Sequence, residues 1–243
     1  MAAFVVAIPA LSLAQSDAEL VNDPRTLDDV LTHSMGYDRT SYSPLDEITR
    51  DNVDDLRMVW TRALTEGFQS GTPLVYEGVM YMPNPRDVIQ AIDAVTGDLV
   101  WEYRRDLPDD VCEFMMAGVC TTNRNLAIYE NLIIDTSVDD YVFALNATTG
   151  DLVWETQILD YRVNPANQSS GPIIANGKVV SGRSCMPRGG PEACVITAHD
   201  ALTGMELWRR HTIPRPGEPG DETWGCLLYT SDAADDTPCV DLG

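Results

Sequence analysis

The sequence predicts an all-β fold built as part of a β-propeller, and two observations support this prediction. The first is an internal repeat that ends in a tryptophan, at Trp101, Trp154 and Trp208, with intervals of 53 and 54 residues. The second is a pair of short apolar segments around a tight turn in the first half of every repeat. Four short strands per repeat, at a period of about 50 residues, are typical of propeller blades.

The second half of each repeat follows the pattern A-x-[DN]-A-x-T-G-x-x-x-W, at 91–101, 144–154 and 198–208. The Asp or Asn side chain can accept hydrogen bonds from the turn that follows it. The glycine can adopt a positive φ. An apolar strand before the turn and a second strand carrying the tryptophan then form a β-hairpin. We therefore expect the three motif tryptophans to be structural residues.

The first half of each repeat predicts another hairpin, with turns at Glu77-Gly78, Glu130-Asn131 and Asn176-Gly177. Between this turn and the tryptophan, the third repeat is eight residues longer than the other two. The extra residues fall between Val180 and Val195. Cys185 and Cys194 lie within this insertion at a spacing that suits a local disulfide. Loops that depart from a regular scaffold often carry function.

The composition excludes several classes of function. The chain has 16 Lys and Arg against 38 Asp and Glu, a net charge of −22. Nucleic-acid binding needs clustered basic residues, so this class is excluded. No apolar run reaches the roughly 18 residues of a membrane span. None of the six cysteines has the C-x-x-C spacing of a zinc ribbon or of covalent haem attachment.

The two ends of the chain depart from the repeat. Residues 1–14 are mostly apolar and end in Ser12-Leu13-Ala14, the small-residue pattern of a signal-peptide cleavage site. A buried N-terminal strand is the alternative. Export would place the chain in a compartment that permits disulfides. We expect the propeller in residues 15–225 and a non-native tail in residues 226–243, which have no helix or strand period. A native acidic tail is the alternative there.

The repeated motif resembles the tryptophan-docking motif of pyrroloquinoline-quinone (PQQ) dependent alcohol dehydrogenases. Residues 42–60 also resemble the N-terminal signature of that family. The resemblance covers about residues 34–225 and implies part of an eight-bladed propeller, in which each tryptophan wedges between neighbouring blades. Three complete motifs and the strand of Trp60 predict about four four-stranded blades. A non-catalytic scaffold of the outer-membrane assembly type is the alternative, because such propellers share the docking repeat.

The resemblance implies a site for PQQ, a flat tricarboxylate quinone, together with Ca²⁺. In the family, an Asn-Arg pair matches Asn123-Arg124, and its arginine pairs with a cofactor carboxylate. A guanidinium suits this role because it can bind a carboxylate through two parallel hydrogen bonds. Ser169 aligns with a hydroxyl that contacts the cofactor. Ser70 lies where relatives often have a glutamate in contact with the cofactor, although serine lacks that charge.

Within the insertion, the segment 189–192 reads Gly-Gly-Pro-Glu and resembles the Gly-Gly-Ala-Glu of the family. This implies cofactor contacts at Gly190 and Pro191 and a Ca²⁺ ligand at Glu192, since Ca²⁺ prefers carboxylate oxygens. A solvated loop glutamate is the alternative for Glu192.

Two further features concern the same resemblance. The family's adjacent cysteines would fall at residues 118–119, which are Gly and Val here, and Cys120 could instead bridge to Cys112. The catalytic aspartate, a Ca²⁺-binding asparagine and a stacking tryptophan of the family would all follow Gly225. The resemblance thus implies a periplasmic enzyme that oxidises a small alcohol and passes electrons to a cytochrome c. The present chain would be an inactive fragment of it.

Overall fold

The computed structural model describes residues 15–115, 120, 122–168, 170–185, 189–190, 192–215 and 217–224. The predicted signal peptide at 1–14 and the predicted tail at 226–243 lie outside these residues. Within them, strands form three antiparallel sheets that follow one another along the chain. The prediction of an all-β partial propeller is confirmed.

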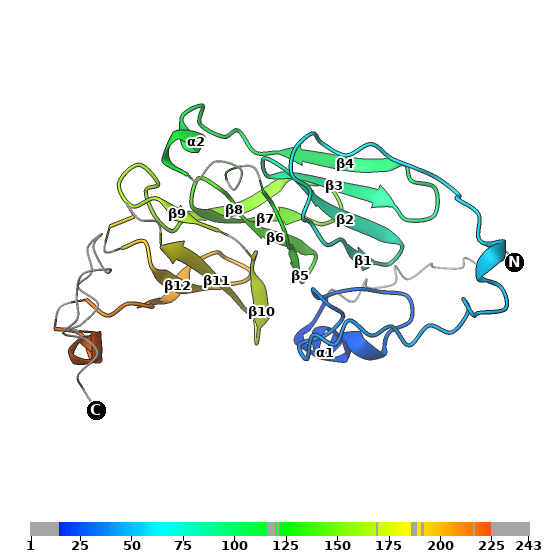
Figure 1. The fold of residues 1–243 in the computed structure, drawn as a ribbon, viewed down its shortest axis with the longest axis horizontal. Helices are drawn as coiled ribbons and strands as arrows, with labels where there is room; N and C mark the ends of the chain where they lie inside the picture. Colours follow the sequence, from blue (N-terminus) through cyan, green and yellow to red (C-terminus); the bar gives the residue numbers. More distant parts are fainter. Residues whose placement is uncertain are drawn as a thin grey trace, which may run out of the picture.

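Each sheet is built on four strands that are consecutive in sequence, and the third sheet has a short fifth strand. The first sheet consists of β1 (Leu74–Tyr76), β2 (Val79–Asn84), β3 (Val88–Asp93) and β4 (Leu99–Arg104). The second consists of β5 (Ala127–Tyr129), β6 (Leu132–Thr136), β7 (Tyr141–Asn146) and β8 (Leu152–Gln157). The third consists of β10 (Ile173–Ala175), β11 (Lys178–Cys185), β12 (Val195–Asp200) and β13 (Glu206–His211), and β9 (Ala166–Asn167) pairs with the end of β11. Figure 1 shows the sheets side by side.

The first hairpin of every sheet has the turn that the sequence predicts. The two central residues have positive φ in all three cases: 48° and 78° at Glu77-Gly78, 48° and 62° at Glu130-Asn131, and 50° and 69° at Asn176-Gly177. Two successive positive φ angles are typical of type I′ turns, whose twist matches that of the flanking strands. Glycine and asparagine at the second position adopt this conformation at low cost.

The second hairpin is also the same in each sheet. Asp93 Oδ1 accepts hydrogen bonds from the amides of Val95 and Thr96, at 2.9 and 2.8 Å. Asn146 and Asp200 bond the corresponding amides of their own turns. A register shift follows the motif alanine in all three sheets and places that alanine opposite the tryptophan of the next strand.

The first two motif tryptophans each join their sheet to the next one. Trp101 donates from Nε1 to the Ala147 carbonyl oxygen at 2.8 Å, and Trp154 donates in the same way to Ala201 at 3.2 Å. The ring lies over the turn glycine of the following sheet, so a Cβ on Gly150 would come within 2.7 Å of Trp101. Trp208 has no following sheet in the described part of the chain and is 37% exposed. The structural role of the docking tryptophans is therefore evident from their contacts.

Of the roughly four blades expected from the resemblance, three are four-stranded sheets in the described residues. The earlier tryptophan, Trp60, lies on a segment that the structure does not assign to a strand. It nevertheless docks as the others do, with Nε1 3.1 Å from the Ala94 carbonyl oxygen and its ring against Gly97. Trp60 thus provides the docking contact of a further blade, whose sheet is not among the described residues.

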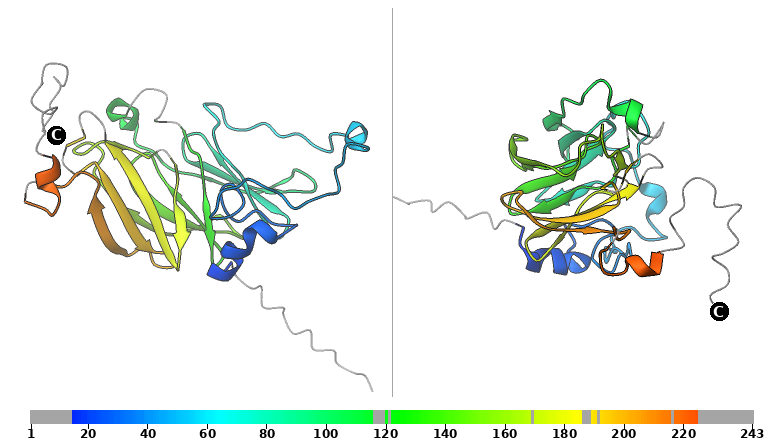
Figure 2. Two further views of the ribbon diagram at one scale, coloured as in Figure 1. Left: turned by 60° about the horizontal axis from the view of Figure 1, so that its bottom comes forward. Right: turned by 90° about the vertical axis from the view of Figure 1, so that its left-hand side faces the viewer.

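The segment before the first sheet crosses β1, β5 and β10. These are the first strands of the three four-strand orders, and we call them the inner strands. It begins with α1 (Asp17–Asn22), which is capped by reciprocal bonds between Ser16 and Glu19. The Asp17 carboxylate accepts a hydrogen bond from the Gly177 amide at 3.1 Å. Val30 pairs with Val75 of β1. Figure 2 shows α1, in dark blue, beside the inner ends of the sheets.

The remaining helices are single turns. They are η1 (Asp23–Arg25), η2 (Val53–Asp55), α2 (Val111–Phe114) and η3 (Asp221–Trp224). No helix among the described residues is long and apolar enough to cross a membrane. The main core runs through all three sheets and includes Ile89, Ile133 and Phe143, each fully buried.

Candidate functional site

The chain segments that lead into the three inner strands meet at one edge of the sheets. The Thr72 amide, before β1, donates to the Arg124 carbonyl oxygen, before β5, at 2.9 Å. The side chain of Asn125 donates to the carbonyl oxygen of Ser170, before β10. Segments from three sheets are therefore tied together at this edge. The structure thus brings Thr72, two residues after Ser70, next to the backbone of Arg124, and it brings Ser170 next to Asn125.

Gly171 explains how closely two of these segments approach. Its φ is +78°, and a Cβ at this position would overlap the carbonyl group of Asn125. Any side chain here would push the second and third sheets apart, so the glycine of the Ser-Ser-Gly-Pro segment is required by packing.

The side chain of Arg124 is exposed and makes no hydrogen bond or ion pair with the described residues, whereas its backbone is held. Ser70 is also exposed. Ser169 lies outside the described residues, so its role stays a prediction. A guanidinium without a partner is notable in a chain with so large an excess of acidic residues. It can bind an anion that approaches this edge.

A buried asparagine lies directly behind Arg124. Asn123 is 1% exposed, and its Nδ2 donates to Oδ2 of Asp135 at 2.6 Å. Asp135 is fully buried at the end of β6, and its Oδ1 accepts the Thr136 amide at 2.7 Å. Burial, followed by the charge of Asp87, raises the pKa of Asp135 well above its usual range.

Further buried carboxyls surround one buried arginine at the same edge. Burial raises the pKa of Asp87 and of Asp140 to about 7. Arg183 of β11 is 4% exposed, and its Nε lies 3.0 Å from Oδ1 of Asp140. These residues link β11 to the loop between β6 and β7. The sequence analysis did not select Asp135 or Arg183, although a charged residue within an apolar strand was the available signal.

A second buried arginine joins the first two sheets. Arg105, after β4, binds both carboxylate oxygens of Asp139 at 2.8 and 2.9 Å. It also lies over the rings of Tyr141 and Phe143, at 4.7 and 5.3 Å from their centroids. The two side chains of the ion pair are only 8% and 7% exposed. This contact fixes the loop between β6 and β7 against the first sheet.

The inserted loop places Glu192 elsewhere on the same edge. The loop follows the end of β11, on the side where β10 starts. Glu192 Oε2 contacts the guanidinium of Arg215 and lies 3.3 Å from Nε2 of His211. Gly190 is exposed with φ +67° and faces Asn164, and Pro191 lies outside the described residues. No contact between this loop and Arg124 is present in the described residues.

The structure shows one of the two cysteine pairs that the sequence suggests. Cys112 and Cys120 form a disulfide, as the sequence left open, and it closes the loop that leads to Arg124. Cys194 is disulfide-bonded. The side chain of Cys185 lies outside the described residues, so its pairing with Cys194 stays a prediction.

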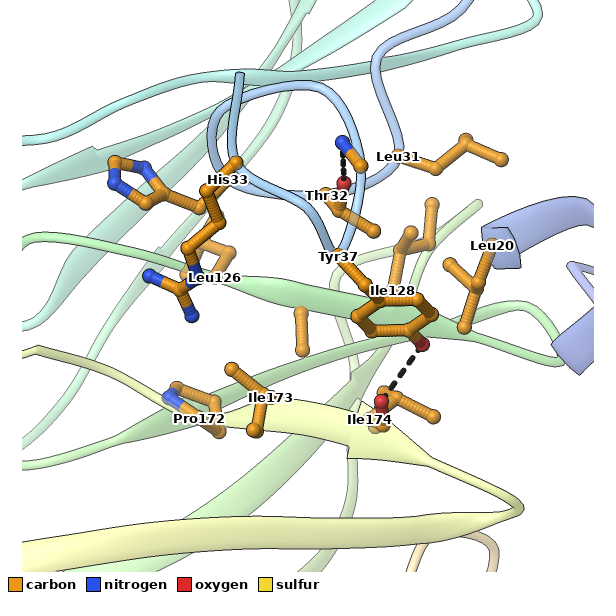
Figure 3. A pocket seen from close by; sticks show the side chains of 13 residues that line it. Leu20, Leu31, Thr32, His33, Tyr37, Leu126, Ile128, Pro172, Ile173 and Ile174 are labelled. Atoms are coloured by element: carbon orange, nitrogen blue, oxygen red, sulfur yellow. Dashed lines mark hydrogen bonds between the residues drawn. The ribbon is translucent and has the colours of Figure 1, made fainter. Parts of the chain in front are cut away.

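A small cavity of about 30 Å³ lies between the N-terminal segment and the inner strands β5 and β10. Figure 3 shows His33 and Tyr37 on one side, and Leu126, Ile128 and Pro172 on the other. The Tyr37 hydroxyl donates to the Ile174 carbonyl oxygen at 2.7 Å and closes one end. Apolar side chains line the cavity together with Thr32, His33 and Arg39, and the cavity borders the segments that carry Arg124 and Ser170.

The residues of this edge fit PQQ and Ca²⁺ to different degrees. The unpartnered guanidinium of Arg124 suits a cofactor with three carboxylates. By contrast, no group of three acidic, histidine or cysteine side chains in the described ranges could hold a metal ion. Glu192 is bonded to a cation of the protein instead. The described residues alone therefore do not form a calcium site.

Comparison with known proteins then decides the family. Residues 32–235 match the model of the PQQ-dependent glucose, ethanol and alcohol dehydrogenase β-propeller domain. The chain belongs to this family. The matched residues include all three sheets and the edge that carries Arg124.

Individual members of the PQQ dehydrogenase family are similar over most of this chain. Quinoprotein alcohol dehydrogenase PedH of Pseudomonas putida is 34% identical over 84% of the chain. The 1-butanol dehydrogenase (cytochrome c) of Thauera butanivorans is 35% identical over 77%. The chain spans only 34% and 25% of the lengths of these two proteins.

A solved structure shows the same arrangement. The quinohemoprotein alcohol dehydrogenase ADHIIG of Pseudomonas putida HK5 superposes with a TM-score of 0.73 at 28% identity. The superposition covers 83% of this chain and 29% of that protein. The three sheets are therefore part of a PQQ dehydrogenase propeller.

Proposed function

We propose that the full-length protein carrying this chain is a PQQ-dependent alcohol dehydrogenase, and that the edge formed by the inner-strand starts holds the cofactor. The observation that carries this proposal is the exposed, unpartnered guanidinium of Arg124 on a backbone bound to neighbouring sheets. PQQ supplies a quinone that accepts two electrons from an alcohol. Arg124 would bind one of its carboxylates.

Other residues of the same edge complete the proposed cofactor site. Ser70 and Ser169 precede β1 and β10. Ser70 is two residues before Thr72, which bonds the Arg124 backbone, and Ser169 is one residue before Ser170, whose carbonyl oxygen accepts the Asn125 side chain. Gly190 and Pro191 would contact the cofactor from the inserted loop. No described residue is proposed as the catalytic base. We expect the catalytic aspartate beyond Gly225, so the 243-residue chain alone should not oxidise alcohols.

The metal is the second part of the proposal. The resemblance assigns Ca²⁺ to Glu192, whose carboxylate is bonded to Arg215 in the structure. Ca²⁺ needs about 6–8 oxygen ligands, so most of them must come from other parts of the protein and from the cofactor. We propose that Glu192 exchanges Arg215 for the metal when the site is complete.

The partners and the compartment follow from the family. We propose a small alcohol as substrate and a cytochrome c as electron acceptor, as the name of the Thauera relative states for that protein. We also propose export to the periplasm, directed by residues 1–14. No contact in the described residues favours the scaffold alternative.

The test uses the full-length protein reconstituted with PQQ and Ca²⁺, an alcohol and an artificial dye as acceptor. We expect PQQ-dependent dye reduction, and PQQ binding weakened about 10- to 100-fold in Arg124→Ala, because a hydrogen-bonded ion pair contributes about 1.5–3 kcal/mol. The control is Arg104→Ala, since Arg104 is 59% exposed on β4 and pairs with Glu102. A wild-type protein that binds no PQQ, or equal affinities in both variants, would contradict the proposal.

A further inference from the structure

We propose that Asp135 is a positioning residue for the cofactor arginine and acts on Arg124 through Asn123. This inference rests on the proposed function and extends it to a buried side chain that cannot touch the cofactor. It concerns how the Arg124 segment is held in one position before PQQ binds.

The first argument is the geometry of the contact between Asp135 and Asn123. Asp135 uses one oxygen for Asn123 Nδ2, at 2.6 Å, and the other for the Thr136 amide, at 2.7 Å. Both residues are almost completely buried, at 0% and 1% exposure. A carboxyl group with both oxygens bonded has one orientation only. Asn123 is thereby fixed to the end of β6.

The second argument is that the residues after Asn123 are held from two other sheets. The Arg124 carbonyl oxygen accepts the Thr72 amide, and the Asn125 side chain reaches the Ser170 carbonyl oxygen. The segment is thus held from the first, second and third sheets, whereas the guanidinium has no partner among the described residues. Fixing the backbone of a binding residue beforehand lowers the entropy that binding costs.

The third argument comes from the repeat itself. Asp135 pairs with Phe143, the residue immediately before the motif alanine Ala144. The equivalent positions are Met82 in the first sheet and Ser181 in the third. Neither is acidic, so the blade fold does not require a carboxyl group here. Among the three described sheets, only the second, which follows Arg124, has an acidic residue at this position.

The groups around Asp135 are consistent with this role. Asp87 opposes a negative charge on Asp135, whereas Arg183 favours it, and burial exceeds both in its effect on the pKa. A neutral side chain of the same shape should therefore serve almost as well. Asp135→Asn keeps a carbonyl oxygen for Asn123 and loses only the local bond to the Thr136 amide, whereas Asp135→Ala removes both acceptors.

The test is a double-mutant cycle on PQQ affinity in the full-length protein. Asp135→Ala should weaken PQQ binding about 10-fold when Arg124 is present and less than twofold in the Arg124→Ala background. Asp135→Asn should stay within about threefold of wild type. Ser181→Ala, at the equivalent position of the third sheet, should change the affinity less than twofold.

A second measurement needs no cofactor. Hydrogen exchange of the Thr72 amide, which is bonded to the Arg124 carbonyl oxygen, should become at least about fivefold faster in Asp135→Ala but not in Ser181→Ala. An unchanged rate would overturn the inference, because the Arg124 segment would then be held without Asp135.

The outcomes separate the inference from the proposed function. A wild-type protein without PQQ affinity would overturn both. If wild type binds PQQ and Arg124→Ala weakens that binding, the proposed function stands. If Asp135→Ala then weakens binding equally in both backgrounds, its effect does not pass through Arg124, and the inference alone is overturned.

Discussion

Replacing Gly150 by alanine should destabilise the chain far more than replacing Gly78, although both glycines have the same backbone conformation. Each has φ +78°. A Cβ on Gly78 would meet nothing within 4 Å, whereas a Cβ on Gly150 would come within 2.7 Å of the Trp101 ring. The pair therefore separates the cost of the backbone conformation from the cost of disturbing the tryptophan that joins two sheets.

The expected magnitudes follow from these contacts. A non-glycine residue in the left-handed region costs about 1–2 kcal/mol, and this applies to both variants. At Gly150, overpacking against the ring should add about 1–3 kcal/mol. Displacing Trp101 would also weaken its 2.8 Å hydrogen bond to Ala147, which contributes about 1 kcal/mol. We expect Gly150→Ala to be less stable than Gly78→Ala by about 2–3 kcal/mol.

The assay is equilibrium urea unfolding of the 243-residue chain at 25 °C, followed by far-ultraviolet circular dichroism. The slope of the free energy of unfolding against urea concentration should not change, so the midpoints report stability. In a Trp101→Ala background, Gly150→Ala should cost no more than Gly78→Ala. Free energies of unfolding that agree within about 0.5 kcal/mol for the two glycine variants would refute this account of docking.

Three further predictions concern the charged residues. Arg105→Met should lower the free energy of unfolding by about 3–5 kcal/mol in urea titrations, because Asp139 would stay buried without its cation; a loss under 1 kcal/mol would contradict this. Burial raises the pKa of Asp87 from 3.8 to about 7. The unfolded carboxyl therefore ionises first, and its effect on stability becomes unfavourable as the pH rises from about 4 to 7. Asp87→Asn should thus gain stability relative to wild type over this range, and a pH-independent difference would disprove the assignment. Finally, calorimetry of the full-length protein with PQQ should show tighter Ca²⁺ binding in Arg215→Met and much weaker binding in Glu192→Gln, whereas unchanged affinities would exclude Glu192 as a ligand.

The three sheets share the repeated motif but differ at the positions that we propose for function. All three sheets use the same turn and the same alanine opposite the tryptophan. Only the second has a buried carboxyl group at the position of Asp135, and only the third has the long loop of Glu192. Function is therefore expected where the repeat is broken.

The sequence by itself determined the elements that depend on neighbouring residues. The Asp93 turn closes through amides two and three residues away, and the type I′ turns need only two residues with positive φ. Such interactions recur wherever the motif recurs, so the three tryptophans, the hairpins and the partial propeller were predictable. The resemblance also selected Arg124, whose backbone the structure places between neighbouring sheets.

Only the tertiary structure decided the partners of those charged residues that are buried or lie outside the repeated motif. Asn123 meets Asp135 across 12 residues, Arg183 meets Asp140 across 43, and Glu192 meets Arg215 across 23. These contacts join different sheets or loops and follow no period in the sequence. A charged side chain inside a protein is stable only beside a matching partner, and which partner is near depends on how the sheets pack. The packing of one blade against the next therefore decided these charged contacts, which the repeated motif does not specify.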